Sequence, residues 1–344
     1  MLYFLNDYSE GAHPKVMEKL SETNLTPVPG YGDDPFCESA KEKIRASLGL
    51  PKADIAFLVG GTQANLVVIS SLLQRWEAVV AVESGHIAVH EAGAVEFTGH
   101  KVIALPSHDG KLDASKLDAY MNRFQADETH DHMCFPGMVY ISYPTELGTL
   151  YSKKELAAVA ETCRKHDLKL YIDGARLGYG LMSDEAELTF REIADLCDVF
   201  YIGGTKVGAL CGEAVVFPKG DMPAHFFTMM KQQGAVLAKG RLAGIQFDVL
   251  FTDDLYFTIS RHAIRMAQEL KRVFTENGFP LYVDSPTNQQ FFILTPAQKA
   301  ALEKEAAFEV WDPIDENAIA CRFVTSWATQ PETIRALDAV LRKL

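Results

Sequence analysis

Lys206 is the first residue of this chain whose type and position suggest covalent chemistry. It follows an apolar strand predicted at residues 198–202, within the window Tyr201-Ile-Gly-Gly-Thr-Lys-Val-Gly208. Only an uncharged amine attacks a carbonyl, and apolar surroundings favour that form, so Lys206 is a candidate for attachment to an aldehyde. On this window alone, a solvated lysine just past a strand is the simpler interpretation.

A second window, Leu170-Tyr-Ile-Asp-Gly-Ala-Arg176, also ends an apolar strand in polar residues. Pyridoxal phosphate requires a lysine for its aldehyde and an acid against its pyridine nitrogen, which keeps the ring an electron sink. Ligands bind at the carboxyl ends of strands in open α/β sheets. An aspartate after a strand often only caps the next helix, but the two windows together predict a pyridoxal phosphate site with Lys206 and Asp173 in these roles.

A glycine-rich turn, Gly60-Gly-Thr-Gln-Ala-Asn65, joins a predicted strand at residues 54–59 to an apolar helix at 66–73. Glycines in such a turn let backbone N–H groups point at an anion, and the helix dipole adds attraction. We therefore expect Gly61, Thr62 and Gln63 to bind a phosphate, although a turn of this composition is often only a turn. Its spacing matches neither GxGxxG nor GK[ST], which disfavours a dinucleotide or a nucleoside triphosphate.

His86 follows another predicted strand, at residues 78–83, and precedes a helix predicted at 87–97. It is therefore expected at the same edge of the sheet as the glycine-rich turn. One interpretation is a flat ring that stacks on a flat cofactor and exchanges protons with a substrate. The other is a histidine that merely caps or packs at a helix start, and the local residues favour the two equally.

Composition and charge restrict the classes of partner. The 344 residues are 48% hydrophobic and carry a net charge of −13, which predicts a large core in two domains and disfavours electrostatic binding to nucleic acid or membranes. No targeting or membrane-spanning run is evident, so cytoplasm is the expected compartment. The six cysteines lack zinc spacing, and Thr129-His-Asp-His132 is interpreted as a solvated loop, so no metal site is expected.

Alternating strands and helices predict an α/β fold with a mainly parallel, seven-stranded sheet. A connector is predicted at Lys231-Gln-Gln-Gly234 and the helical run after it, and the order of elements changes from Thr252 onward. We therefore expect a large domain at residues 1–250 with an N-terminal arm, and a small α+β domain at 251–344. The sheet strands are predicted at residues 54–59, 78–83, 101–105, 137–143, 169–172, 198–202 and 213–217. The small domain is predicted to hold helices at 253–277 and 332–344 and strands near 288–294, 308–311 and 318–324.

Taken together, five windows of the chain resemble the threonine aldolase and β-eliminating lyase family of pyridoxal phosphate enzymes. The resemblance runs nearly end to end and implies the aspartate-aminotransferase-like fold, fold type I. The windows are Tyr31-Gly-Asp-Asp-Pro35, Gly61-Thr-Gln-Ala-Asn65, His86 with Glu91-Ala-Gly93, Asp173-Gly-Ala-Arg176 and Gly203-Gly-Thr-Lys206.

The resemblance implies how the cofactor is held. Lys206, next to Thr205, would form the Schiff base, and Asp173 would pair with the pyridine nitrogen. The turn at residues 61–63 would hold the phosphate, and His86 would stack on the ring. These roles agree with those argued from the strand ends.

The resemblance also implies substrate contacts and a shared site in a homodimer or homotetramer. Arg176 and Arg322 would grip the substrate carboxylate with their forked guanidinium groups. Asn6 stands where many relatives carry a serine that helps hold this carboxylate, and its amide can still donate. Tyr31 would reach a neighbouring subunit's site, and Arg241 would reach that site's phosphate.

The predicted reaction is retro-aldol cleavage of L-β-hydroxy-α-amino acids to glycine and an aldehyde, with His86 as the base. The expected substrates are threonine, allo-threonine or phenylserine-like compounds. The loop Tyr143-Pro-Thr-Glu146 lacks the second histidine that many threonine-specific relatives carry near the substrate hydroxyl, which disfavours strict threonine specificity and leaves bulkier β-hydroxy amino acids open. The alternatives are β-elimination on the same scaffold and a non-catalytic cofactor-binding paralogue.

Overall fold

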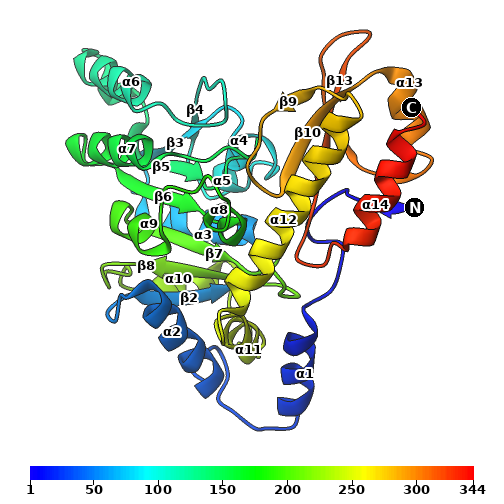
Figure 1. The fold of residues 1–344 in the computed structure, drawn as a ribbon. Helices are drawn as coiled ribbons and strands as arrows, with labels where there is room; N and C mark the ends of the chain where they lie inside the picture. The colour runs from blue at the N-terminus through cyan, green and yellow to red at the C-terminus, as the bar shows by residue number, and fades with distance from the viewer.

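A seven-stranded sheet forms the centre of the larger part of the molecule in the computed structural model, which describes residues 1–344 (Figure 1). The strand order is β2-β8-β7-β6-β5-β3-β4, and β8 alone runs antiparallel to its neighbours. The α/β prediction with a mainly parallel sheet is therefore confirmed. The strands are β2 (Asp54–Leu58), β3 (Glu77–Val82), β4 (Val102–Leu105), β5 (Phe135–Ser142), β6 (Lys169–Asp173), β7 (Val199–Gly203) and β8 (Glu213–Phe217).

Helices bury both faces of this sheet, which explains the near-continuous apolar runs of its strands. Ile141, Ile172 and Phe200 point into one core layer, whereas Tyr140, Tyr171 and their neighbours on adjacent strands point into the other. The first layer packs against α2 (Pro35–Leu48), α6 (Ala114–Ala126), α7 (Lys153–Lys165), α9 (Phe190–Leu196) and α11 (Arg241–Leu250). The second packs against α3 (Gly61–Leu72), α5 (Ala94–Phe97) and α10 (Phe226–Gln232).

Several helices differ from the predictions, and two of the differences lie near the site. The expected helix at residues 87–97 is two short helices, α4 (His86–Val89) and α5, because Ala92 and Gly93 take left-handed φ angles of 51° and 75°. Helix α3 begins at Gly61, five residues before the apolar run that predicted it. Helix α6 was not predicted, and Thr129-His-Asp-His132 contains a short 3₁₀ helix, η1 (His130–His132), rather than only a loop.

The smaller part of the molecule is a four-stranded antiparallel sheet of order β12-β13-β10-β9, reached through the long helix α12 (Leu255–Glu276) (Figure 1). This confirms the α+β C-terminal part. The first residues of the chain also lie here, since β1 (Leu2–Tyr3) pairs with β11 (Ala306–Ala307). The remaining strands and helices are β9 (Leu281–Val283), β10 (Gln289–Leu294), α13 (Pro296–Leu302), β12 (Glu309–Pro313), β13 (Ile319–Val324) and α14 (Pro331–Leu341).

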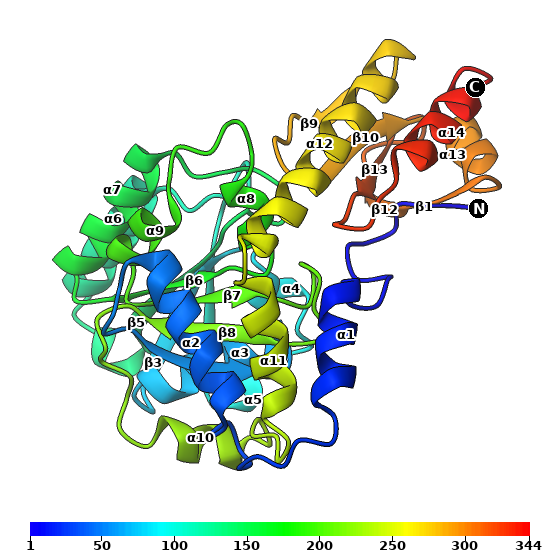
Figure 2. The ribbon, with the colours of Figure 1, turned by 60° about the horizontal axis from the view of Figure 1, so that its bottom comes forward.

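Two further helices complete the fold. Helix α1 (Pro14–Thr23) lies beside α11 (Figure 2), and α8 (Leu177–Leu181) follows β6. Helix α11 ends at Leu250, and the domain boundary expected at this residue stays a prediction. None of the helices has the length and apolar character needed to cross a membrane.

Candidate active site

A polar pocket of about 260 Å³ lies where β5, β6 and β7 end. Parallel strands place their carboxyl ends at one edge of the sheet, which brings together residues far apart in the sequence. Most of the predicted site residues line this pocket, namely Gly61, Thr62, His86, Asp173, Arg176, Thr205 and Lys206.

Asp173, the last residue of β6, is a buried carboxylate surrounded by donors. Oδ2 accepts from the Tyr140 hydroxyl at 2.7 Å and the Asn65 amide at 3.1 Å. Oδ1 accepts from the Tyr201 hydroxyl and from the Ala175 backbone N–H. Burial opposes ionisation, but His86 and these hydrogen bonds outweigh it and hold the pKa of Asp173 below its usual value.

The tyrosines around Asp173 were not identified from the sequence. Tyr140, Tyr171 and Tyr201 come from three adjacent strands on the same face of the sheet. The Tyr171 hydroxyl donates to the side-chain oxygen of Asn65 at 2.8 Å. It thereby orients the Asn65 side-chain amide, whose nitrogen donates to Asp173. A tyrosine near the end of each of three apolar strands was the signal that could have revealed this network.

Lys206 lies three residues beyond Gly203, the last residue of β7, and its amine makes no hydrogen bond or ion pair. Its Nζ lies 6.0 Å from the centre of the Tyr8 ring. Burial, reinforced by the positive charge of Arg176, lowers the pKa of Lys206, although Asp7, Asp173 and Glu213 oppose this shift. The neutral, nucleophilic amine is therefore more accessible here than on the surface.

Glu213, at the start of β8, holds the loop that presents Lys206. Its carboxylate accepts from the Thr205 hydroxyl at 2.8 Å and from the Gly204 backbone N–H at 3.0 Å. Burial raises the pKa of Glu213 to about 7 against these hydrogen bonds. Thr205 thus lines the pocket, and its hydroxyl helps to position the loop that carries Lys206. The sequence analysis did not identify Glu213.

The first turn of α3 points its backbone into the same pocket. Gly60 is the N-cap, and no side chain caps the helix. The N–H groups at this end consequently lack intrahelical partners, which suits an anion. The Gln63 side-chain oxygen accepts from the Val59 N–H at 3.1 Å, and Gln63, unlike Gly61 and Thr62, does not line the pocket.

His86 begins α4 and is oriented by a buried acid. Its Nδ1 lies 2.8 Å from Oε1 of Glu91, which also accepts from the Asn65 amide at 2.7 Å. A carboxylate only accepts, so Nδ1 carries the proton and Nε2 is left for exchange with a ligand. Glu91 directly follows the C-cap of α4, His90, just before the left-handed residues that split the predicted helix.

Arg176 is held by an acid that the sequence analysis did not assign. Its Nε and Nη2 donate to the two oxygens of Asp7 at 2.7 and 3.0 Å. Nη1 makes no such bond and remains for a second carboxylate. Asn6 does not line the pocket, and its side-chain oxygen accepts from the Tyr8 N–H and the Ser9 hydroxyl.

Arg322, on β13, lies beyond the lining of the pocket. Its Nη1 donates to Gln289 at 2.9 Å, Nη2 pairs with Glu309, and its Nε is buried without a partner. The guanidinium lies 5.1 Å from the centre of the Trp311 ring. Burial, with Arg176 next in importance, lowers the pKa of Arg322, so an additional anion would be favourable at this place.

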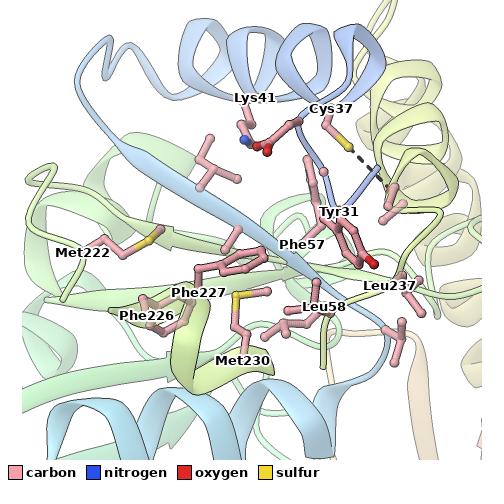
Figure 3. A pocket seen from close by; sticks show the side chains of 18 residues that line it. Tyr31, Cys37, Lys41, Phe57, Leu58, Met222, Phe226, Phe227, Met230 and Leu237 are labelled. Carbon is pink, nitrogen blue, oxygen red and sulfur yellow. Dashed lines mark hydrogen bonds between the residues drawn. The ribbon is translucent and has the colours of Figure 1, made fainter. Parts of the chain in front are cut away.

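Tyr31 and Arg241 do not reach the Lys206 pocket of their own chain. Tyr31 is 50% exposed and lines a separate apolar pocket of about 180 Å³ with Phe57, Phe226 and Met230 (Figure 3). Arg241 donates to two backbone carbonyls, those of Thr23, the last residue of α1, and of Thr26 beyond it. The predicted contacts of these two residues with a neighbouring subunit therefore remain predictions.

Comparisons with known proteins agree with this geometry. The sequence profile of the β-eliminating lyases matches residues 8–322. The low specificity L-threonine aldolase of Pseudomonas aeruginosa is 30% identical over 98% of this chain and 96% of its own. The structure of a Leishmania major threonine aldolase is 40% identical, covers 100% of this chain and 99% of its own, and superposes with a TM-score of 0.96.

A more distant structure confirms the fold. Aspartate aminotransferase from Thermus thermophilus superposes with a TM-score of 0.71 at 17% identity, over 100% of this chain and 91% of its own. The aspartate-aminotransferase-like fold, fold type I, is therefore confirmed. With the profile match over most of its length, the chain belongs to the β-eliminating lyase family, as a relative of the threonine aldolases.

Proposed function

We propose that this protein is a pyridoxal-phosphate-dependent aldolase that cleaves L-β-hydroxy-α-amino acids to glycine and an aldehyde. The observation that carries the proposal is the unpaired Lys206 amine in one pocket with the ionised Asp173. Incubation with such amino acids, followed by quantification of glycine and aldehyde, tests it. The names of the threonine aldolase relatives support the same substrate class.

The residues present fit pyridoxal phosphate. The uncapped first turn of α3 suits the phosphate, Lys206 the aldehyde, Asp173 the pyridine nitrogen and His86 one face of the ring. When bound, the cofactor supplies an electron sink for the bond that breaks at the substrate Cα.

The other residues bind the substrate and move its protons. Arg176, through the nitrogen that Asp7 leaves free, and Arg322 hold the substrate carboxylate. This grip orients the Cα–Cβ bond toward cleavage. His86, with Nδ1 fixed by Glu91, accepts the β-hydroxyl proton at Nε2, alone or through water, so that the aldehyde is released.

Arg176→Lys should raise KM far more than it lowers kcat. Lysine keeps a positive charge for Asp7 but cannot bridge two carboxylates. Loss of one charge-assisted hydrogen bond is worth about 1.5–3 kcal/mol, which corresponds to roughly a 10- to 150-fold rise in KM. Steady-state kinetics of glycine formation measure the effect, with the exposed Arg191→Lys, whose partner is Asp195, as the matched control. An unchanged KM would show that Arg176 does not bind the carboxylate.

The active unit in this proposal is a homodimer, free or within a tetramer. The Tyr31 pocket is apolar and open to solvent in one chain, and the neighbouring Phe227 is 53% exposed (Figure 3). Coverage by a second copy would bury this surface and bring the segment of Tyr31 toward the partner's site, with Arg241 near the partner's phosphate.

Mixed oligomers test the shared site. When Lys206→Ala and Tyr31→Ala subunits are unfolded and refolded together, random pairing should restore about one quarter of parental activity, because half of the mixed dimers' sites are intact. The control mixture joins Lys206→Ala with Asp173→Asn, two residues of the same pocket, and should restore little. Equal recovery in both mixtures, or full activity of a monomer in size-exclusion chromatography, would contradict the shared site.

A further inference from the structure

Glu146 is a buried acid of the active-site pocket to which the mechanism above assigns no role. It follows β5, is 9% exposed and lines the pocket. Its Oε1 accepts from the Ser142 hydroxyl at 2.6 Å and from the His86 backbone N–H at 2.9 Å. Its Oε2 is buried without any hydrogen-bond partner. A charged oxygen in this state is costly, whereas a protonated one is a donor that awaits an acceptor.

The other acids near the pocket differ from Glu146. Asp173 accepts four hydrogen bonds, and Glu213 uses both of its oxygens on the lysine loop. Glu91 also has an unpartnered Oε2, but it does not line the pocket. Glu146 therefore combines a place in the pocket wall with an unused carboxyl oxygen.

The surroundings of Glu146 favour its neutral form. Burial raises the pKa of Glu146, and the charge of Asp173 adds to this shift, while the hydrogen bonds from Ser142 and His86 oppose it. The titratable groups that face Glu146 are Asp173 on β6, His86 on α4, Tyr140 on β5 and Tyr151 on the segment before α7. None of these groups forms an ion pair with Glu146.

We propose that Glu146 is a neutral acid whose Oε2–H donates a hydrogen bond to the pyridoxal phosphate bound in this pocket. The inference rests on the proposed function. Oε1 is tied to the backbone of His86, so the same side chain links the position of that ring to the position of the cofactor. The bound cofactor would supply the acceptor that Oε2 lacks. Glu146 is thus a positioning residue for the cofactor, and no proton is transferred.

Two variants test whether Glu146 acts on the cofactor as a hydrogen-bond donor or through a negative charge. Glu146→Gln keeps the oxygen that accepts from Ser142 and His86 and replaces O–H by an N–H donor, whereas Glu146→Leu removes both functions. We expect the dissociation constant of pyridoxal phosphate, measured by spectroscopic titration, to change less than about threefold in Glu146→Gln and to rise about tenfold or more in Glu146→Leu. Glu83→Gln, an exposed acid next to the end of β3, is the matched control and should bind as the parent does.

Infrared difference spectra at neutral pH test the protonation directly. The spectrum of the parent minus that of Glu146→Gln should show the C=O stretch of a protonated carboxyl group, and the spectrum of the parent minus that of Glu83→Gln should not. Any contribution from Glu213, whose pKa is raised to about 7, is common to these proteins and cancels. This arm decides the question even if Glu146→Leu fails to fold. Absence of the band from the difference between the parent and Glu146→Gln, or binding by Glu146→Gln as weak as that of Glu146→Leu, overturns the inference. Unchanged cofactor binding in a folded Glu146→Leu variant overturns only the inference about Glu146. A parent protein that does not bind pyridoxal phosphate overturns the proposed function as well.

Discussion

Lys206→Ala should abolish turnover, with a fall in kcat of roughly four to six orders of magnitude, the range seen when a covalent nucleophile is removed from an enzyme. The parent, loaded with pyridoxal phosphate, should be yellow, and borohydride reduction should fix the cofactor to the peptide that carries Lys206. We expect the cofactor to be attached to Lys206 because the amine of this residue has no hydrogen-bond partner and burial lowers its pKa.

The control for Lys206 is Lys219→Ala. Lys219 is an exposed lysine of the same domain that forms an ion pair with Asp198 at 2.7 Å, so its loss should leave colour and turnover intact. Peptide mapping after reduction identifies the labelled lysine. A label on any other lysine, or a parent that stays colourless with added cofactor, would contradict the assignment of Lys206.

His86→Phe should keep the cofactor and lose the reaction. Phenylalanine retains a flat ring for stacking, but it cannot accept a proton, so aldehyde release should fall by roughly two to four orders of magnitude. Cofactor affinity should change little in comparison. Rates of aldehyde formation and spectroscopic titration with pyridoxal phosphate measure the two effects separately.

The exposed His132→Phe is the control for this substitution, since His132 lies in η1 and does not line the pocket. Cleavage by His86→Phe at the parental rate would leave His86 as a stacking residue only. The Glu91→Gln variant refines the result, because it weakens the bond that fixes Nδ1 of His86 while keeping the imidazole. A rate between those of the parent and His86→Phe is expected.

Much of this site was predictable because parallel strands place their ends at one edge of a sheet. Asp173 and Lys206 could be paired from the sequence since each follows a recognisable apolar strand, and the glycine-rich turn lay at a third strand end. The fold class followed from the alternation of strands and helices.

The missed residues reach the site through contacts between distant segments. Asp7 pairs with Arg176 across 169 positions, and no local pattern marks such a partner. The tyrosines near Asp173 resemble ordinary core residues in the sequence, and their hydroxyl partners become visible only when β5, β6 and β7 are aligned. The break between α4 and α5 depends on a left-handed alanine, Ala92, which residue preferences alone do not predict.

Product analysis tests the central claim most directly. The purified protein with pyridoxal phosphate is given L-threonine, L-allo-threonine and phenylserine, and, in parallel, serine derivatives with good leaving groups that report β-elimination. The account predicts equal amounts of glycine and aldehyde from at least one β-hydroxy amino acid, with Lys206→Ala as the blank. Pyruvate and ammonia from the serine derivatives, with no glycine from any β-hydroxy substrate, would contradict the aldolase assignment and show instead that the protein is a β-eliminating lyase.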